Sequence, residues 1–395
     1  MHLGERTAVT EISDTSSAYD LVCLSHLRWN FVFQRPQHLL MRCARERRVF
    51  FWEEPISDAG TTAFLEYTSH DGVMVVTPHL PPGTSERTII AEQRRMIDNL
   101  LADEQLVDYV LWYYTPMALP FTEHLVPEAI VYDCMDELTA FVNAPPTLKA
   151  MEARLLGRAD VMFTGGQSLY EAKRGAHPNV HPFPSSVDVD HFAQARRMNY
   201  DPEDQAGLPH PRLGFFGVID ERMDVELLRG VALARPSWHV ILLGPVVKID
   251  PATLPALPNI HYLGSKTYKE LPAYIGSWDV ALLPFARNEA TRFISPTKTP
   301  EYMAAGRPVV STSIRDVVRP YGVQGMVRIA DSVGDFVAAC EAAMAEDPSP
   351  RARAADAFLR QMSWDGTWTR MRHLVDAAVA GDIAPLRSSP SAIAQ

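Results

Sequence analysis

The chain contains few cysteines. There are four among its 395 residues, and none belongs to a C-x-x-C pair or lies near a group of histidines. A disulfide framework needs many cysteines in a short secreted chain, and a structural zinc site needs closely spaced Cys and His ligands. We therefore expect neither disulfides nor a bound metal. The four are Cys23, Cys43, Cys134 and Cys340.

Long hydrophobic runs are also missing. A helix that crosses a bilayer needs about 20 consecutive apolar residues, and no segment of the sequence approaches this length. The first residues are polar and lack the apolar core of a signal peptide. These two absences predict a cytoplasmic protein without a transmembrane segment.

Basic residues are fewer than acidic residues. The formal net charge is −11, whereas binding to a nucleic-acid backbone needs a basic surface, so we expect no nucleic-acid partner. One local group of arginines, at the end of the first predicted helix, departs from this trend. It would either touch an anionic membrane weakly, at the inner face of the membrane, or lie in solvent as an ordinary helix end. Its members are Arg42, Arg45, Arg47 and Arg48.

Several well-known nucleotide-binding and catalytic motifs are absent. Neither half of the chain carries G-x-G-x-x-G after its first predicted strand, and there is no Walker loop or G-x-S-x-G elbow. The first motif holds the pyrophosphate of a dinucleotide, and its absence disfavours a nicotinamide-dependent dehydrogenase.

The length and the order of apolar segments predict two α/β domains. A chain of 395 residues is too long for one ordinary core. Short apolar runs alternate with helical segments, a pattern typical of parallel sheets covered by helices, and the pattern restarts after a region rich in Pro and Asp. The expected strands are 19–25, 48–52, 73–77, 109–113, 130–132 and 161–164, then 213–218, 238–243, 260–263, 280–283 and 309–311.

This pattern divides the chain into five parts. We expect a disordered N-terminus (1–18), a first Rossmann-like domain (19–200), a second Rossmann-like domain (201–362), a helix that returns to the first domain (363–380) and a flexible tail (381–395).

The most informative segment is 295–312, which reads as a loop, a helix, a glycine turn and a buried strand. Pro296 and Pro300 suit the start of a helix, and Gly306 suits its end. A helix start favours phosphate, and Lys298 would add a positive charge there. Glu301, about one turn further, could accept hydrogen bonds from two ribose hydroxyls. Together these features outline a pocket for a nucleoside diphosphate.

The run from Glu301 to Val310, Glu-Tyr-Met-Ala-Ala-Gly-Arg-Pro-Val-Val, resembles the donor-site signature of nucleotide-sugar glycosyltransferases with the GT-B fold, especially the large retaining family 4, or group 1. Glu301 matches the second glutamate of that signature, which holds the ribose. The first glutamate would fall at Phe293 and is absent, although Glu289 lies one turn earlier. Met135 stands where the family usually has a histidine.

The resemblance covers roughly residues 20–375 and implies a GT-B enzyme whose second domain binds the donor. It assigns Gly217 and Arg222 to the diphosphate, and Lys248 or Lys298 would replace the family's lysine, whose position is taken by Asp224 or a neighbour. The loop residues Ser265, Lys266 and Tyr268 would hold the nucleobase, and Ser295 and Thr297 flank the phosphate site. Arg222 and Lys298 would also stabilise the leaving group, and Glu289 would contact the transferred sugar or remain in a solvated loop.

The first domain would bind the acceptor. The segment after its first strand offers His26, Arg28, Trp29 and Arg35, although the aromatic side chain could equally pack in the core. Asp136 would act as a base in an inverting enzyme or simply cap a helix. Farther along, Gly165 and Gly166 allow a close backbone approach across the cleft.

We therefore expect a metal-independent glycosyltransferase without cofactors that moves a sugar from a UDP- or GDP-type donor to an acceptor, with retention of configuration. Segments 33–38 and 295–298 resemble a bacterial subgroup close to teichuronic-acid and other cell-surface polysaccharide transferases, which points to a glycan or lipid-linked acceptor. The alternatives are an inverting transferase, a nucleotide-sugar epimerase of the same fold, and a non-catalytic nucleotide-sugar-binding protein.

Overall fold

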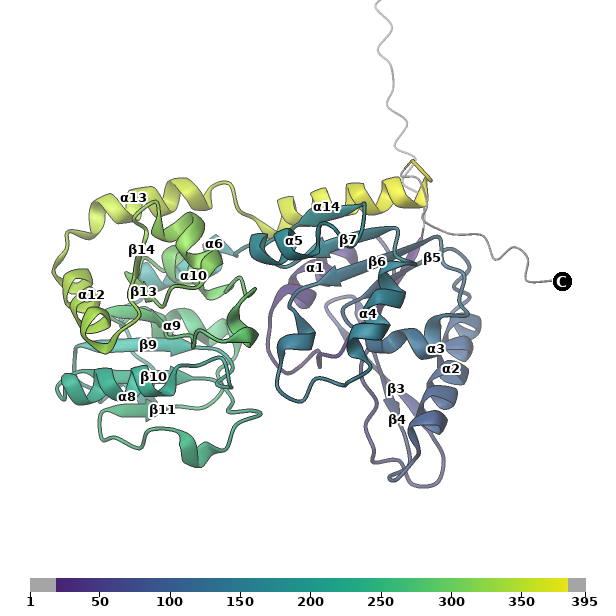
Figure 1. Cartoon of the computed structure of the whole chain (residues 1–395), viewed down its shortest axis with the longest axis horizontal. Helices are drawn as coiled ribbons and strands as arrows, with labels where there is room; N and C mark the ends of the chain where they lie inside the picture. Colours follow the sequence, from purple (N-terminus) through teal and green to yellow (C-terminus); the bar gives the residue numbers. More distant parts are fainter. Residues whose placement is uncertain (1–18, 383–395) are drawn as a thin grey trace, which may run out of the picture.

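The computed structural model describes residues 19–382, so the predictions for 1–18 and for 383–395 lie outside the described residues. Two α/β domains stand side by side, and a long C-terminal helix runs across the top of the first (Figure 1). No helix in the described range is long and apolar enough to cross a membrane.

The first domain is built on an eight-stranded sheet in the order β3-β4-β2-β1-β5-β6-β7-β8. All neighbours pair in parallel except β3 and β4, which are antiparallel. The central strands are continuous apolar runs because both faces of the sheet are covered by packed side chains. The strands are β1 (Asp20–Leu24), β2 (Val49–Trp52), β3 (Phe64–His70), β4 (Val73–His79), β5 (Tyr109–Tyr113), β6 (Ala129–Cys134), β7 (Val161–Thr164) and β8 (Val180–Pro182).

Five α-helices connect these strands. The first, α1, begins with Pro36 in its first turn, where a missing N–H does no harm, and Gln34 and Gln37 form a capping box around its start. The helices are α1 (Arg35–Cys43), α2 (Glu86–Asp103), α3 (Leu119–Thr122), α4 (Leu148–Leu156) and α5 (Gln167–Lys173).

The second domain contains a six-stranded, fully parallel sheet in the order β11-β10-β9-β12-β13-β14. Its strands are β9 (Arg212–Phe216), β10 (His239–Leu243), β11 (Ile260–Tyr262), β12 (Val280–Leu283), β13 (Val309–Ser311) and β14 (Val327–Ile329). Its helices are α8 (Val225–Ala234), α9 (Leu271–Ile275), α10 (Lys298–Ala304), α11 (Arg315–Val317), α12 (Val333–Ala345) and α13 (Pro348–Leu359).

The chain passes between the domains twice. The first passage follows β8 and contains α6 (Val189–Ala193) and α7 (Glu203–Ala206). The predicted boundary at residue 200 lies within it, and Val187 and Phe192 already pack in the core of the second domain. The second passage ends in α14 (Trp364–Val379), which Ser363 caps. Four side chains of α14 pack into the core on one face of the first sheet, which confirms the predicted return of the last helix. They are Trp364, Trp368, Met371 and Val375.

The arginine group near the end of α1 does not form a free basic patch. Arg42 and Arg45 pair with Asp365 of α14, and Arg48 pairs with Asp20. The guanidinium of Arg47 lies 3.8 Å from the centre of the Tyr19 ring. These contacts favour the ordinary helix end of the two alternatives, because carboxylates and an aromatic ring already contact these side chains. The weak membrane contact stays a prediction.

Candidate functional site

A cavity of about 730 Å³ lies between the two domains. Loops that follow β1 and β6 form its wall in the first domain, and loops that follow β9 to β12 form its wall in the second. Both walls are thus carboxyl ends of parallel strands, where α/β sheets bind ligands. The predicted residues that line it are Trp29, Asp136, Gly217, Arg222, Ser265, Lys266, Tyr268, Ser295, Thr297, Lys298 and Glu301.

Glu301 presents an unused hydrogen-bond acceptor to this cavity. It lies on α10 and is 8% exposed, and its Oε2 has no partner among the described residues. Burial raises the pKa of Glu301 to about 8, against the opposing attraction of Lys298. The next residue holds α10 against β9, because the N–H of Phe216 donates to the hydroxyl of Tyr302 at 3.0 Å. A buried carboxyl without a partner is unfavourable unless a ligand supplies the donors.

Lys298 lies across the backbone of Gly217 at the end of β9. Gly217 has φ +132°, and a Cβ at this position would be 2.1 Å from Cε of Lys298. Only glycine therefore leaves room for the lysine, whose pKa is lowered by burial. Gly244, at the end of β10, has φ +140°, and its Cβ would lie 1.9 Å from the carbonyl oxygen of Gly217. We did not predict Gly244, although a glycine directly after an apolar run was a usable signal.

Arg222 is held in place by Asp220, a residue that the sequence did not single out. Its Nε and Nη2 donate to the two Asp220 oxygens at 2.9 and 2.6 Å. Asp136 reaches the cavity from the first domain, and its pKa is raised by burial and by Asp220, while Arg222 and Lys298 oppose the shift. Two cations of the second domain and a carboxylate of the first therefore share one electrostatic environment across the cavity.

Three of the four predicted acceptor residues do not line the cavity. Arg35 is 2% exposed and makes a two-point ion pair with Asp133 at 2.9 and 2.8 Å, so it is a buried structural residue. Arg28 is engaged by Glu53 at 2.9 Å. His26 is largely buried, and burial lowers its pKa to about 4.

The fourth predicted acceptor residue, Trp29, lines the cavity but is buried. Its ring packs edge-on against Phe51 at 5.0 Å, as a core side chain does. The neighbouring Phe31 is 46% exposed and is the aromatic residue that this loop offers to a ligand.

The predicted nucleobase residues are already engaged. The ring of Tyr268 lies between His191 at 4.1 Å and Phe33 at 4.6 Å, so neither of its faces is free to stack on a base. The ammonium group of Lys266 pairs with Asp204 at 2.6 Å. Ser265 remains on the cavity wall.

Lys248 and Glu289 lie outside the cavity lining. The Lys248 ammonium group lies 5.2 Å from the centre of the Phe141 ring. The side chain of Glu289 is 76% exposed and pairs with Arg292, which favours the solvated loop of the two alternatives expected for it. Phe293, at the position of the absent first glutamate, packs instead against a core cluster of the first domain.

The predicted close approach across the cleft is found at Gly166, whereas Gly165 approaches its own domain. A Cβ on Gly166 would lie 2.3 Å from Oδ2 of Asp316 and 2.7 Å from Cβ of Ser295, both in the second domain. A Cβ on Gly165 would lie 2.1 Å from the carbonyl oxygen of Met135. The domains touch here without space for any side chain.

The second domain is similar to a known family of sequences. Residues 210–346 match the family described as Glycosyl transferases group 1. A relative from Bacillus subtilis (strain 168), named as a teichuronic acid biosynthesis glycosyltransferase, TuaH, is 26% identical over 257 residues. This match covers 60% of the present chain and spans 64% of the length of the relative.

Solved structures resemble the whole described chain. Sucrose-phosphate synthase from Thermosynechococcus elongatus has a TM-score of 0.72 at 13% identity, covering 92% of this chain and 100% of that one. The Anabaena protein Alr3699/HepE, in complex with UDP and glucose, has a TM-score of 0.64 at 13% identity over 91% of this chain and 100% of that one. An E. coli structure with bound UDP-2-fluoro glucose has a TM-score of 0.67 at 12% identity, over 90% and 99%.

Identities this low show the fold alone, and that fold is GT-B, as the two facing parallel-sheet domains and the returning helix indicate. Lys298, Glu301, Gly217 and Arg222 all lie within the segment matched to the family. The chain therefore has the GT-B fold, and residues 210–346 of its second half are similar to the glycosyl transferases group 1 family.

Proposed function

We propose that this protein is a glycosyltransferase that moves a sugar from a nucleoside diphosphate sugar to an acceptor hydroxyl. One observation carries the proposal: the unpartnered carboxyl of Glu301 and the cations Lys298 and Arg222 line the same cavity. The group 1 match covers these three residues. Uracil is the proposed base within the UDP or GDP class, because two similar structures contain UDP or a UDP sugar.

Each of the three side chains has a proposed role. Glu301 accepts hydrogen bonds from the ribose hydroxyls, and Lys298 and Arg222 face the diphosphate. During transfer, the acceptor oxygen bonds to the anomeric carbon while the bond from that carbon to the diphosphate oxygen breaks. The electron pair stays on that oxygen, and the two cations stabilise the charge that develops there.

We propose retention of configuration, with the acceptor proton passing to the departing diphosphate oxygen. Inversion is the alternative that a specific observation favours, because Asp136 lies in the cavity with a raised pKa and could accept that proton. The anomeric configuration of the product, read by proton NMR, separates the two. In an inverting enzyme, Asp136→Asn would also lower kcat by about 100-fold or more.

We further propose a cell-surface glycan or lipid-linked acceptor, because the relative from Bacillus subtilis is named for teichuronic acid biosynthesis. The first-domain wall of the cavity is suited to an amphipathic acceptor. Val32, Phe33 and Met41 line it beside the exposed Phe31, so it offers apolar area close to polar loop groups.

The first test is a thermal-shift panel of UDP, GDP, ADP, TDP and NAD. A ligand at 100 times its Kd stabilises the folded state by about 2.7 kcal/mol, which is readily detected. We expect one nucleoside diphosphate, UDP, to stabilise the wild type and to lose its effect in Glu301→Ala.

Glu289→Ala is the matched control, since this glutamate is exposed outside the cavity, and its response should equal that of the wild type. EDTA should not change the shift, because the proposal requires no metal. If all five ligands leave the melting temperature unchanged, or if the response persists in Glu301→Ala, the donor-site assignment is wrong.

A further inference from the structure

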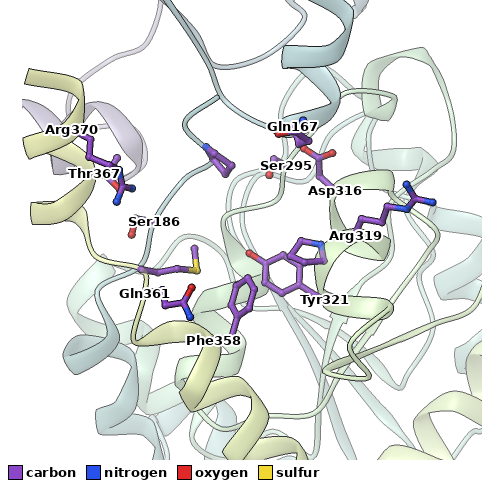
Figure 2. Close-up of a pocket in the computed structure, with 13 residues that line it drawn as sticks. Gln167, Ser186, Ser295, Asp316, Arg319, Tyr321, Phe358, Gln361, Thr367 and Arg370 are labelled. Carbon is purple, nitrogen blue, oxygen red and sulfur yellow. The ribbon is translucent and has the colours of Figure 1, made fainter. Parts of the chain in front are cut away.

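A second cavity, of about 220 Å³, lies where the chain passes twice between the domains (Figure 2). Its walls come from the start of α5, the linker after β8, the segment around α11, and the junction of α13 with α14. We call it the crossover cavity; its polar side chains include Gln167, Ser186, Asp316, Tyr321, Gln361 and Arg370. Ser295 lines both cavities, so the two adjoin there.

One buried hydroxyl group without a partner lines this cavity, and a second hydroxyl points into it. Ser186 is 3% exposed, and its Oγ makes no hydrogen bond within residues 19–382. Tyr321 is 8% exposed, and its hydroxyl is directed into the space between the two walls (Figure 2). Proteins rarely bury polar groups unpaired, because water or a ligand is needed to replace the lost hydration. These hydroxyls therefore indicate a ligand that both donates and accepts hydrogen bonds.

The charges around the cavity restrict that ligand. Asp316 already accepts the Ser168 N–H at 3.0 and 3.3 Å across the domain interface. Arg370 forms no ion pair with any described residue, while the guanidinium of Arg319 points away from the cavity (Figure 2). One carboxylate and one guanidinium, which lies 6.0 Å from the centre of the Phe183 ring, nearly cancel in charge. A diphosphate would need more positive charge, and a divalent cation would need more oxygen ligands than one engaged carboxylate.

Apolar surfaces complete the lining. The ring of Tyr321 packs against Phe358 at 5.3 Å, and Pro184 and Pro320 also line the cavity. A ligand that fits has hydroxyls along its edge and C–H groups on its faces, in a molecule close to neutral. We propose that the crossover cavity is a second carbohydrate-binding site, which holds one sugar ring, either a free monosaccharide or one unit of a glycan.

Saturation-transfer-difference NMR on the full chain tests this proposal. The probes are glucose, galactose, N-acetylglucosamine and glucuronic acid, together with a disaccharide to separate a free sugar from a glycan unit. Saturating UDP is present throughout to occupy the nucleotide part of the larger cavity. We expect at least one sugar to bind the wild type, Tyr321→Phe to weaken that binding at least threefold, and Ser186→Phe, which fills the cavity, to abolish it.

Two controls keep the test falsifiable. Ser186→Phe must retain the UDP thermal shift of the wild type, and if it does not fold, Tyr321→Phe and Arg370→Ala carry the test. Arg353→Ala, an exposed arginine on α13, should bind sugar as the wild type does. Equal sugar binding by the wild type and every cavity variant would overturn the proposal, as would failure of all five sugars to bind the wild type.

Discussion

Gly217 shows how a single absent side chain shapes the candidate donor site. Its φ of +132° already disfavours other residues, and a Cβ would collide with Lys298. We expect Gly217→Ala to displace the lysine, weaken nucleoside diphosphate binding about 10-fold and cost about 1–3 kcal/mol of stability. Calorimetric titration with UDP and urea denaturation would measure the two effects.

Two comparisons separate displacement of Lys298 from backbone strain. Gly325→Ala has φ +70° with nothing within 4 Å of a Cβ, so it should lose stability but keep its affinity. If the lysine carries the effect, adding Gly217→Ala to Lys298→Ala should weaken UDP binding no further. A full additional loss in the double variant would contradict this explanation.

Glu301 predicts a pH dependence of stability. Burial favours the neutral carboxyl and raises its pKa in the folded protein to about 8, above its value in the unfolded chain. The resulting stability is complete below the unfolded-state pKa of about 4.3 and is lost as the pH rises through about 8. Glu301→Gln stays neutral, so without ligand it should become about 1–2 kcal/mol more stable than the wild type between pH 5.5 and 9. Urea denaturation across this range would show no such divergence if the carboxyl were ionised throughout.

Helix α1 is tied to the first sheet by a buried ion pair rather than aimed at a ligand. Arg35 and Asp133 are 2% and 0% exposed, and the guanidinium also donates to the carbonyl of Phe183. Breaking such a pair leaves a buried charge uncompensated, so Arg35→Ala should cost about 3–5 kcal/mol. Arg45→Ala, which loses an exposed pair with Asp365, should cost at most about 1 kcal/mol in the same denaturant series. Similar losses in the two variants would contradict a buried structural role.

The sequence predicted elements with continuous apolar runs and missed those without them. The ranges 161–164, 280–283 and 309–311 agree with β7, β12 and β13. β3 and β14 were missed because they are edge strands without a continuous buried apolar run: β3 is mostly exposed, and only Val327 of β14 is buried. A hydrophobic pattern in the sequence reveals a strand through the burial of its side chains, and these strands have too few buried side chains to show such a pattern.

The sequence could not show which side chains of the candidate site pair with one another. The loops of the cavity were located because parallel strands align their carboxyl ends. The sequence did not show which arginine faces a ligand, because Asp133, which pairs with Arg35, lies 98 positions away. For the same reason, the sequence did not predict that the ring of Tyr268 contacts Phe33 of the other domain. Such contacts depend on how the two domains meet, which local patterns do not encode.

The meeting of the two domains at Gly166 provides a test of the whole arrangement. Its φ of −166° is extended backbone that any residue adopts, so Gly166→Ala adds no strain within the first domain. The added Cβ would instead meet Asp316 and Ser295 of the second domain. We expect the variant to hold its domains farther apart, with a larger radius of gyration by small-angle scattering and about 10-fold weaker UDP binding.

Gly175→Ala supplies the matched control, because this glycine follows the same helix and has nothing within 4 Å of a Cβ. It should scatter and bind as the wild type does. Unchanged scattering and affinity in Gly166→Ala would show that the close contact at this glycine does not determine how the domains meet. A larger radius with full affinity would show instead that the donor site is complete within the second domain, since Gly217, Arg222, Lys298 and Glu301 all belong to it.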